Sequence, residues 1–427
     1  MLGSGAVFEQ TFRFLYVFLL LPILLVILLA ILLAVSGKSF GLREQYVDAL
    51  IRIFEAGLTR IIHKETEITL KDADSTDPFH EVVVESRGWA AIRDSIDFIK
   101  VIAAGIESVI EDEVTSRFEA EQLVSWNMLT RTSIRSYHFV NWKLSILWVL
   151  GFLLRYCLML PFRFILFSIG VVLLLVSTAT IGLVPDGKLK NCMLLCCRIL
   201  SQSLTAVVKF YDVHNRARNG GICVSNHTSP IDVVLLSTDN VYALVGQQHF
   251  GALGLIQRAL SRASRHIWFE RTEANDRRLV TAILREHCRS STNLPILIFP
   301  EGTCINNTSV MMFKKGSFEV STKIYPIAMK YDSRFGDPFW NSSSQSWCEY
   351  MFRMMTSWAI LCNVYYLAPM EKLVLISNFQ PDEDATAFAS RVKKSIAFRG
   401  GLLDLEWDGG LKRTRVHPKL VAKQQER

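Results

Sequence analysis

Two long runs of apolar residues limit what this chain can fold into. The first run, Phe14–Gly37, holds no charged residue, and about two dozen residues can cross a hydrocarbon core of about 30 Å as a helix. We therefore predict a membrane anchor in residues 1–37. A cleaved signal peptide is the competing interpretation, because Arg13 precedes the run and Ala34-Val35-Ser36 loosely resembles a cleavage site. The run exceeds the usual apolar core of a signal peptide, about 7–15 residues, which favours the anchor.

The second apolar run extends from Leu144 to Pro185 and is interrupted by Arg155 and Arg163. Its latter half, Phe164–Pro185, is again long enough to span a bilayer. The sequence leaves two arrangements open for residues 144–185. One is a spanning helix with an interfacial lead-in, and the other is a two-helix hairpin that enters one leaflet.

The composition agrees with a chain that lies partly in lipid. Half of the 427 residues are hydrophobic and only 20% are charged, which is too apolar for an ordinary soluble enzyme. The net charge of +7 comes from scattered Lys and Arg, with no long basic run before the tail Lys412–Arg427. This pattern fits an anionic membrane surface or phosphate ligands better than a nucleic-acid groove.

The nine cysteines match neither a disulfide scaffold nor paired zinc sites, which indicates a reducing, cytosolic environment. Three of them, Cys192, Cys196 and Cys197, lie close to the second apolar run. S-acylation near a membrane is one interpretation, and small buried hydrophobic residues are the favoured one.

Two other regions carry no catalytic motif. Residues 38–143 are predicted to be a soluble, amphipathic helical region of unknown role, with its clearest helix-like stretch at Ile92–Leu129 and a β-like run at Glu81–Ser86. The uncharged stretch Met355–Met370 is short for a membrane span. We expect it to pack in a core or an interface.

After Asp186, short apolar runs bounded by turn residues alternate with helical stretches. Three of these runs, Gly221–Ser225, Leu294–Phe299 and Ile324–Lys330, have the pattern of buried strands. The sequence therefore predicts an α/β catalytic domain over residues 186–427.

The clearest motif, Val224–Asp232, follows a predicted strand and opens a predicted helix. Ser229 suits the helix cap, Pro230 the first helical position, and Asp232 completes a capping box. The helix start does not explain His227, whose ring would lie at a strand end, where α/β sheets bind ligands. Asp232 could hold its imidazole as the orienting partner of a general base. Taken alone, a structural histidine remains the commoner case.

Two further blocks carry polar groups at strand ends. In His266–Arg271, the Arg271 guanidinium could clamp a phosphate, or it could pair with Glu270 or Glu273 at the surface.

The block Pro295–Thr303 ends in a turn, where Gly302 lets backbone amides approach a ligand and Glu301 and Thr303 could bind hydroxyls. An ordinary strand-end turn is the alternative interpretation. Lys314 and Lys315 add positive charge nearby.

A fourth block centres on Pro326, which suits either a wall for an acyl chain or a core strand. In order and composition the four blocks resemble the glycerolipid acyltransferase superfamily, whose motifs are His-x4-Asp, a segment ending in Arg, Phe-Pro-Glu-Gly, and a segment centred on Pro. The run FPEGTCINN at 299–307 is similar to the microsomal glycerol-3-phosphate acyltransferases, types three and four. That similarity covers nearly all of Val224–Arg413. Cys304 stands where many lysophosphatidate acyltransferases carry Arg.

The resemblance implies a central mixed sheet flanked by helices and an acyl-CoA-dependent transfer to the sn-1 hydroxyl of sn-glycerol 3-phosphate. The product would be lysophosphatidic acid, in the first step of phospholipid and triacylglycerol synthesis. Acyl-CoA would be a substrate, with no metal or other cofactor. The expected catalytic pair is His227 and Asp232, the acyl-CoA site lies near Pro326, and the expected acceptor-binding residues are Arg271, Glu301, Gly302, Thr303, Lys314 and Lys315.

Two rival functions share these features. A lysophosphatidate or other lysophospholipid acyltransferase uses the same chemistry with a different acceptor, whereas an inactive membrane scaffold would not need the complete set of motifs. The resemblance also implies the endoplasmic reticulum membrane, or the surface of lipid droplets, with the catalytic domain facing the cytosol. Glycosylation sequons at Asn226, Asn306 and Asn341, and Lys188 and Lys190 beyond the second apolar run, favour that orientation.

Overall fold

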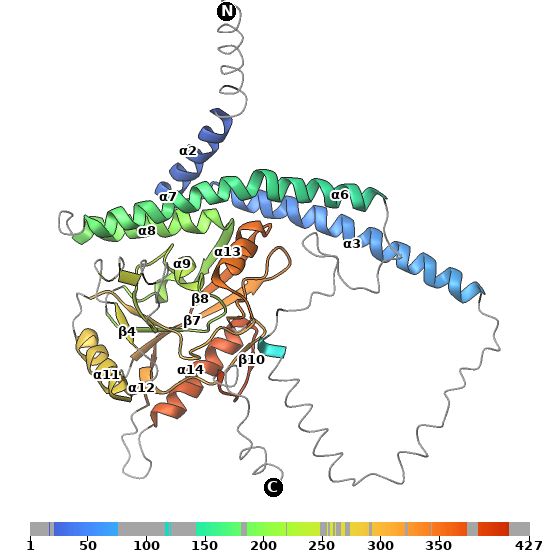
Figure 1. The fold of residues 1–427 in the computed structure, drawn as a ribbon. Helices are drawn as coiled ribbons and strands as arrows, with labels where there is room; N and C mark the ends of the chain where they lie inside the picture. Colours follow the sequence, from blue (N-terminus) through green and yellow to red (C-terminus); the bar gives the residue numbers. More distant parts are fainter. Residues whose placement is uncertain are drawn as a thin grey trace, which may run out of the picture.

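A mixed β-sheet between two layers of helices forms the centre of the molecule (Figure 1). The computed structural model describes residues 17, 21–75, 116–118, 120, 142–180, 186–218, 220–247, 254, 257–258, 261, 266–269, 274–289, 293–320, 323–342, 344–373 and 383–409. The predicted α/β domain with a central mixed sheet is confirmed.

The main sheet has eight strands. Its order is β1 (Ala206–Tyr211), β8 (Ile360–Tyr366), β7 (Lys323–Asp332), β2 (Ile222–Ser225), β5 (Ile296–Ile298), β3 (Ala243–Gln247) and β4 (Ile267–Phe269), with β9 (Met370–Glu371) also on β7. Strands β7, β2, β5, β3 and β4 run parallel, whereas β1 and β8 run in the opposite direction. The three strands predicted from sequence are β2, β5 and β7. Their carboxyl ends therefore meet at one edge of the sheet.

Both faces of this sheet are covered. Helices α8 (Asp186–Ser203), α9 (Asp232–Leu236) and α13 (Trp347–Thr356) lie on one face, and α11 (Ala274–Arg289), α12 (Gly316–Val320) and α14 (Ala385–Gly400) on the other (Figure 1). Along β2, Cys223 packs toward α9 and α13, whereas Ile222 and Val224 pack toward α14. Burial on both sides explains why the strands are continuously apolar. A short pair, β6 (Ser309–Val310) and β10 (Leu403–Asp404), lies beside the main sheet.

The second apolar run forms one unbroken helix, composed of α6 (Trp142–Leu153), a π-helical segment η4 (Leu154–Met159) and α7 (Leu160–Ala179). The hairpin interpretation is therefore wrong. Arg155 and Arg163 do not interrupt the helix, because both side chains are buried against the end of α13, where they donate to the Thr356 and Met355 carbonyls. Within the described residues, Ser145–Ala179 is the one helix long and apolar enough to cross a membrane.

Helix α2 (Leu21–Ser36) is the described part of the predicted anchor and is a shorter apolar helix of 16 residues. Its insertion in a membrane stays a prediction. The uncharged stretch Met355–Met370 contains the end of α13 and all of β8, and it packs in the core as expected.

Helix α3 (Leu42–Ser75) lies within the predicted helical region 38–143, although no helix was assigned to these residues, and Leu147 of α6 packs against its first half (Figure 1). Its Leu50 and Phe54 pack with Phe335 and Trp358 of the catalytic domain. The predicted stretch Ile92–Leu129 lies outside the described residues except for 116–118 and 120, and the run Glu81–Ser86 lies wholly outside them.

The described residues 116–118 form a single 3-10 turn, η2 (Ser116–Phe118), that lies against the loop after β5. The Arg117 carbonyl accepts the Asn306 N–H at 3.0 Å, and Arg117 Nη1 donates to Thr308 Oγ1 at 3.0 Å. A part of the region between the two apolar runs thus contacts the segment that carries the third motif.

Candidate active site

His227 and Asp232 lie together at the carboxyl end of β2. The strand ends at Ser225, His227 follows in the connecting loop, and Asp232 is the first residue of α9. His227 Nδ1 lies 2.9 Å from Asp232 Oδ2, in a site where the carboxylate is fully buried. The structure brings these two side chains together as the sequence predicted.

The helix start differs from the predicted one. Helix α9 begins at Asp232, and Pro230 and Ile231 form a turn before it rather than its first helical residues. The Asp232 carboxylate nevertheless caps this turn, because Oδ2 also accepts the N–H groups of Thr228 at 2.8 Å and Ser229 at 2.9 Å. One carboxylate oxygen therefore holds both the loop and the imidazole.

The loop after β5 covers the imidazole of His227. The Phe299 ring stacks on it, with ring centroids 4.2 Å apart and an angle of 22° between the planes. The Cys304 sulfur lies 3.4 Å from Nε2, the nitrogen that does not face Asp232. The sequence marked Cys304 as a family difference but gave it no role. Its contact with His227 depends on the meeting of two loops 77 residues apart.

Glu301 connects three backbone segments rather than facing an open crevice. Its side chain is 1% exposed, Oε2 accepts the N–H of His227 at 2.7 Å, and Oε1 accepts the N–H of Met311 at 2.9 Å. Burial raises the pKa of this carboxyl to about 8, against the opposite effect of the two N–H donors. This geometry favours a positioning role over the predicted contact with acceptor hydroxyls.

Gly302 and Lys314 meet at the rim of the site. Gly302 has a φ of 69°, a left-handed conformation that favours glycine, and its N–H donates to the Phe299 carbonyl at 3.1 Å. A Cβ built on Gly302 would lie 3.5 Å from the Lys314 ammonium. An exposed cation thus lies directly over the turn of the third motif.

Lys315 and Thr303 have different surroundings. The Lys315 ammonium pairs with Glu319 at 3.0 Å, one turn along α12, and its side chain is 64% exposed. It is therefore not brought to the site with Lys314, because the intervening peptide directs it along its own helix. Thr303 is buried, and among the described residues no group hydrogen-bonds its Oγ1.

The surroundings of His227 act on its pKa in opposite directions. Burial lowers the pKa, whereas the Cys304 sulfur and the hydrogen-bonded Asp232 carboxylate raise it, and the net shift is above the usual histidine value. A histidine held by a carboxylate in this way is a stronger base than a free imidazole. A proton acceptor whose pKa is raised in this way suits the deprotonation of a hydroxyl.

Two other predicted residues have different outcomes. Pro326 lies in β7 opposite Val224 of β2 and is buried, so the structure agrees with its interpretation as a core residue. Its proximity to an acyl-CoA site stays a prediction. Arg271 lies outside the described residues, and its role as a phosphate clamp likewise stays a prediction.

Two of the three sequons are buried in this site. Asn226 is 2% exposed and Asn306 is 3% exposed, and both amide ends of Asn226 are bonded to the Met329 backbone, at 2.8 and 2.9 Å. A glycan cannot be accommodated there in the folded protein. These two sequons therefore give no information about which side of a membrane the domain faces.

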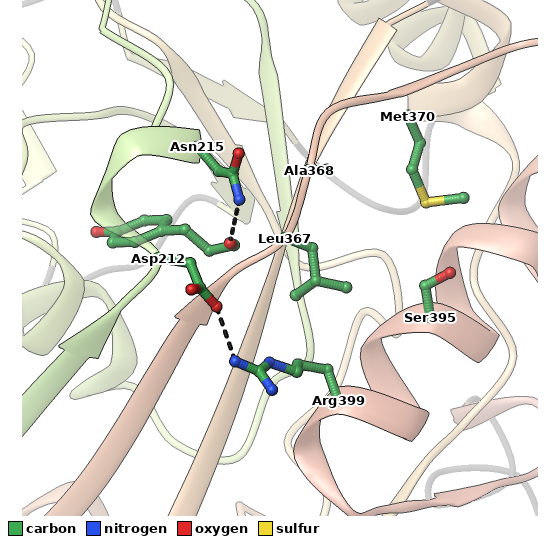
Figure 2. A pocket seen from close by; sticks show the side chains of 8 residues that line it. Asp212, Asn215, Leu367, Ala368, Met370, Ser395 and Arg399 are labelled. Atoms are coloured by element: carbon green, nitrogen blue, oxygen red, sulfur yellow. Dashed lines mark hydrogen bonds and ion pairs between the residues drawn. The ribbon is translucent and has the colours of Figure 1, made fainter.

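A separate hollow of about 420 Å³ lies at the opposite edge of the sheet (Figure 2). Its wall includes an ion pair of 2.8 Å between Arg399 of α14 and Asp212, and Asn215 donates to the Tyr366 carbonyl. Strands β1 and β8 end here, and they run opposite to β2. The hollow is thus distant from His227, and none of the predicted site residues lines it.

A sequence match to a known protein family covers the part of the chain that carries these strands and loops. A family model described as Acyltransferase matches residues 207–330, which extend from β1 into β7 and include His227, Asp232 and Glu301. The fold and site thus define an acyltransferase. A solved lysophosphatidate acyltransferase, PlsC from Thermotoga maritima, is 14% identical, with a TM-score of 0.40 over 59% of this chain and 97% of that chain.

Two curated relatives show to which family of acyltransferases the chain belongs. Glycerol-3-phosphate acyltransferase 3-like from Danio rerio is 48% identical over 410 residues, which cover 92% of this chain and 91% of that protein. Glycerol-3-phosphate acyltransferase 4 from Homo sapiens is 46% identical over 413 residues, which cover 92% of this chain and 89% of that protein. The chain belongs to the family of glycerol-3-phosphate acyltransferases 3 and 4.

Proposed function

We propose that this enzyme transfers an acyl group from acyl-CoA to the sn-1 hydroxyl of sn-glycerol 3-phosphate, which yields lysophosphatidic acid and free CoA. The observation that carries the proposal is the buried His227–Asp232 pair at the carboxyl edge of the sheet. Family membership supports glycerol 3-phosphate as the acceptor.

In this mechanism the acceptor hydroxyl binds at His227 Nε2, since Nδ1 is held by Asp232. His227 takes the hydroxyl proton as the oxygen attacks the thioester carbonyl, and the Asp232 carboxylate stabilises the imidazolium. The carbon–sulfur bond then breaks, and the imidazolium returns the proton to the CoA thiolate. The net reaction exchanges a thioester for an ester, so neither a metal nor another cofactor is needed in this proposal.

The acceptor is tested with purified protein, one acyl-CoA, and either glycerol 3-phosphate or lysophosphatidate at equal concentration. We expect rapid formation of lysophosphatidic acid from glycerol 3-phosphate and slow turnover of lysophosphatidate. The reverse preference would assign the chain to the rival lysophosphatidate reaction. No turnover of either acceptor or of another lysophospholipid would favour the inactive scaffold.

Lys314 should help to hold the acceptor phosphate, together with Arg271. Because a charge-assisted hydrogen bond contributes more than a neutral one, Lys314→Ala should raise KM for glycerol 3-phosphate about tenfold and leave KM for acyl-CoA unchanged. Lys315→Ala is the matched control, since that lysine pairs with Glu319 instead. Steady-state kinetics with each substrate varied in turn measures both effects. Equal KM changes in the two variants would contradict this assignment.

The contact between Cys304 and His227 suggests a second mechanism. A thiol bonded to a histidine that is bonded to a carboxylate can carry the acyl group covalently as a thioester. We expect direct transfer, in which the acceptor hydroxyl replaces the thiol at Nε2. Cys304→Ala should then keep kcat within about tenfold of wild type, and two-substrate plots should intersect. Parallel plots, with a mass increase of one acyl group on wild-type protein but not on Cys304→Ala, would establish the covalent route instead.

We further propose that the enzyme lies on the endoplasmic reticulum membrane or lipid droplets, with its catalytic domain on the cytosolic side. Large apolar side chains of α2, α6 and α7 are exposed in the isolated chain, and acyl-CoA is a cytosolic substrate. Protease treatment of sealed microsomes should remove the C-terminal domain. Protection of that domain until detergent is added would contradict the orientation.

A further inference from the structure

The Asp232 carboxylate has a hydrogen-bond partner that no sequence motif indicates. Oδ2 accepts three donors, all from the loop that precedes α9: the ring of His227 and the N–H groups of Thr228 and Ser229. Oδ1 accepts the hydroxyl of Tyr331, at 2.5 Å. Tyr331 comes from a different element, the carboxyl end of β7, 99 residues further along the chain.

We propose that Tyr331 is a positioning residue whose hydroxyl fixes the Asp232 carboxylate and sets how strongly His227 binds a proton. The proposal rests on the proposed function, in which His227 is the base. A carboxylate shared among several donors attracts the imidazolium less strongly than one with a free oxygen. The phenol therefore limits the basicity that Asp232 confers on His227.

The position of Tyr331 is fixed by contacts that connect β7 to both catalytic loops. Asn307 Oδ1 accepts the N–H of Tyr331 at 2.7 Å, and Asn307 Nδ2 donates to Thr228 Oγ1 at 2.9 Å. Asn226 binds both the N–H and the carbonyl of Met329 on the same strand. Strand β7 is therefore bonded both to the loop that carries His227 and to the loop after β5. These bonds hold the Tyr331 phenol at a fixed position relative to the Asp232 carboxylate.

Tyr331 can act as a donor at every pH at which the enzyme works. Its side chain is 4% exposed, and burial together with the Asp232 charge holds its pKa well above the usual tyrosine value. The hydroxyl therefore remains protonated. A neutral phenol has one proton to donate, and here that proton goes to Asp232 Oδ1, while the Cys362 thiol also bonds to the phenol oxygen.

Several other titratable groups face this pair from the elements packed around it. They are the Glu301 carboxyl and the Cys304 thiol from the loop after β5, the Tyr350 phenol from α13 and the Cys362 thiol from β8. The Tyr350 hydroxyl bonds to Ser229 Oγ and not to the carboxylate. Tyr350 is thus a buried phenol in the same cluster as Tyr331. When its hydroxyl is removed, both oxygens of Asp232 keep their hydrogen-bond donors.

The test is Tyr331→Phe, with Tyr350→Phe as its matched control, in full-length enzyme purified in detergent. Loss of the Tyr331 hydroxyl should lower kcat about tenfold, with smaller changes in both KM values. It should also raise the pKa of His227, so the acidic limb of the pH profile of kcat/KM should move upward by about one unit. Tyr350→Phe should keep the acidic limb in its wild-type position.

An unshifted acidic limb in folded Tyr331→Phe, or equal shifts in both variants, would overturn the proposal. If Tyr331→Phe does not fold, a second variant tests the proposal. In this variant 3,5-difluorotyrosine replaces Tyr331, and its more acidic phenol is a stronger hydrogen-bond donor. The acidic limb should then move downward, and an upward shift or none would contradict the assignment. Failure of the proposed acceptor would be seen in the wild-type enzyme, whereas failure of the Tyr331 proposal would be seen only in the variants.

Discussion

Replacing His227 with alanine is expected to lower kcat by about 10²–10⁴-fold, the usual contribution of one positioned general base. The imidazole is the proposed base, and the other described side chain that bonds to Asp232, that of Tyr331, is a phenol that donates its proton to the carboxylate and does not accept one. KM for acyl-CoA should change little, because the ring is not expected to bind the coenzyme. The measurement is a steady-state acyl-CoA assay of the detergent-purified variant.

The matched control is His214→Ala. His214 lies exposed in η6 (Val213–Asn215), at the opposite edge of the sheet, so this variant should keep wild-type turnover. Both variants should also keep the wild-type unfolding temperature within a few degrees, because the buried Asp232 carboxylate keeps three other donors when the His227 ring is removed. Full activity in folded His227→Ala protein would exclude the histidine from the chemistry and would leave the acyltransferase assignment without its proposed base.

The sequence predicted the catalytic edge of this fold well because the signals there are local. Strands β2, β5 and β7 are short apolar runs bounded by turn residues, and parallel strands bring their carboxyl ends to one edge. The pairing of His227 with Asp232 needs only a strand end and a helix start five residues apart. Both features are visible in one short segment of chain.

The contacts that the sequence did not predict join segments far apart in the chain. Tyr331 reaches Asp232 across 99 residues, and Cys304 reaches His227 across 77. Neither residue type nor spacing indicates such pairs, because they depend on which strands become neighbours in the sheet. Glu301 is a third case. From the sequence we expected its carboxylate to bind the acceptor, because the two N–H groups that it binds, those of His227 and Met311, come from other segments of the chain.

The two arginines in the second apolar run show how a local signal can mislead. As isolated charges, Arg155 and Arg163 suggested an interruption of the membrane segment. In the structure they lie on the face of a continuous helix that contacts the catalytic domain, and the residues they bind are found only when α13 and β8 are placed. Their hydrogen bonds join the apolar helix to the end of α13 and the residues that follow it.

Arg163→Met should strongly destabilise the enzyme. The guanidinium is 1% exposed and donates to the carbonyls of Met355, Ser357 and Trp358. Tyr46 of α3 also donates to the Trp358 carbonyl, so two carbonyls would lose their donor. Each buried carbonyl left unpaired costs about 1–3 kcal/mol, which predicts a loss of about 2–6 kcal/mol in the free energy of unfolding.

Arg155→Met is the matched control, on the same helix eight residues earlier. Arg155 makes one hydrogen bond of 3.4 Å, to the Thr356 carbonyl, and its guanidinium lies over the Trp358 ring. Its loss should therefore lower the unfolding temperature in detergent far less than loss of Arg163. Equally small effects of the two substitutions would mean that the helix is attached by its apolar contacts alone.

The two arginine variants also separate attachment from catalysis. The carbonyls that Arg163 binds lie at the end of α13 and in the link to β8, and α13 carries Tyr350, whose hydroxyl bonds to Ser229 beside the His227–Asp232 pair. Arg163→Met should consequently lose activity at temperatures where Arg155→Met and wild type remain active, and its kcat at low temperature should stay close to wild type. A large loss of kcat in fully folded Arg163→Met protein would show instead that the apolar helix controls the geometry of His227 directly, through α13.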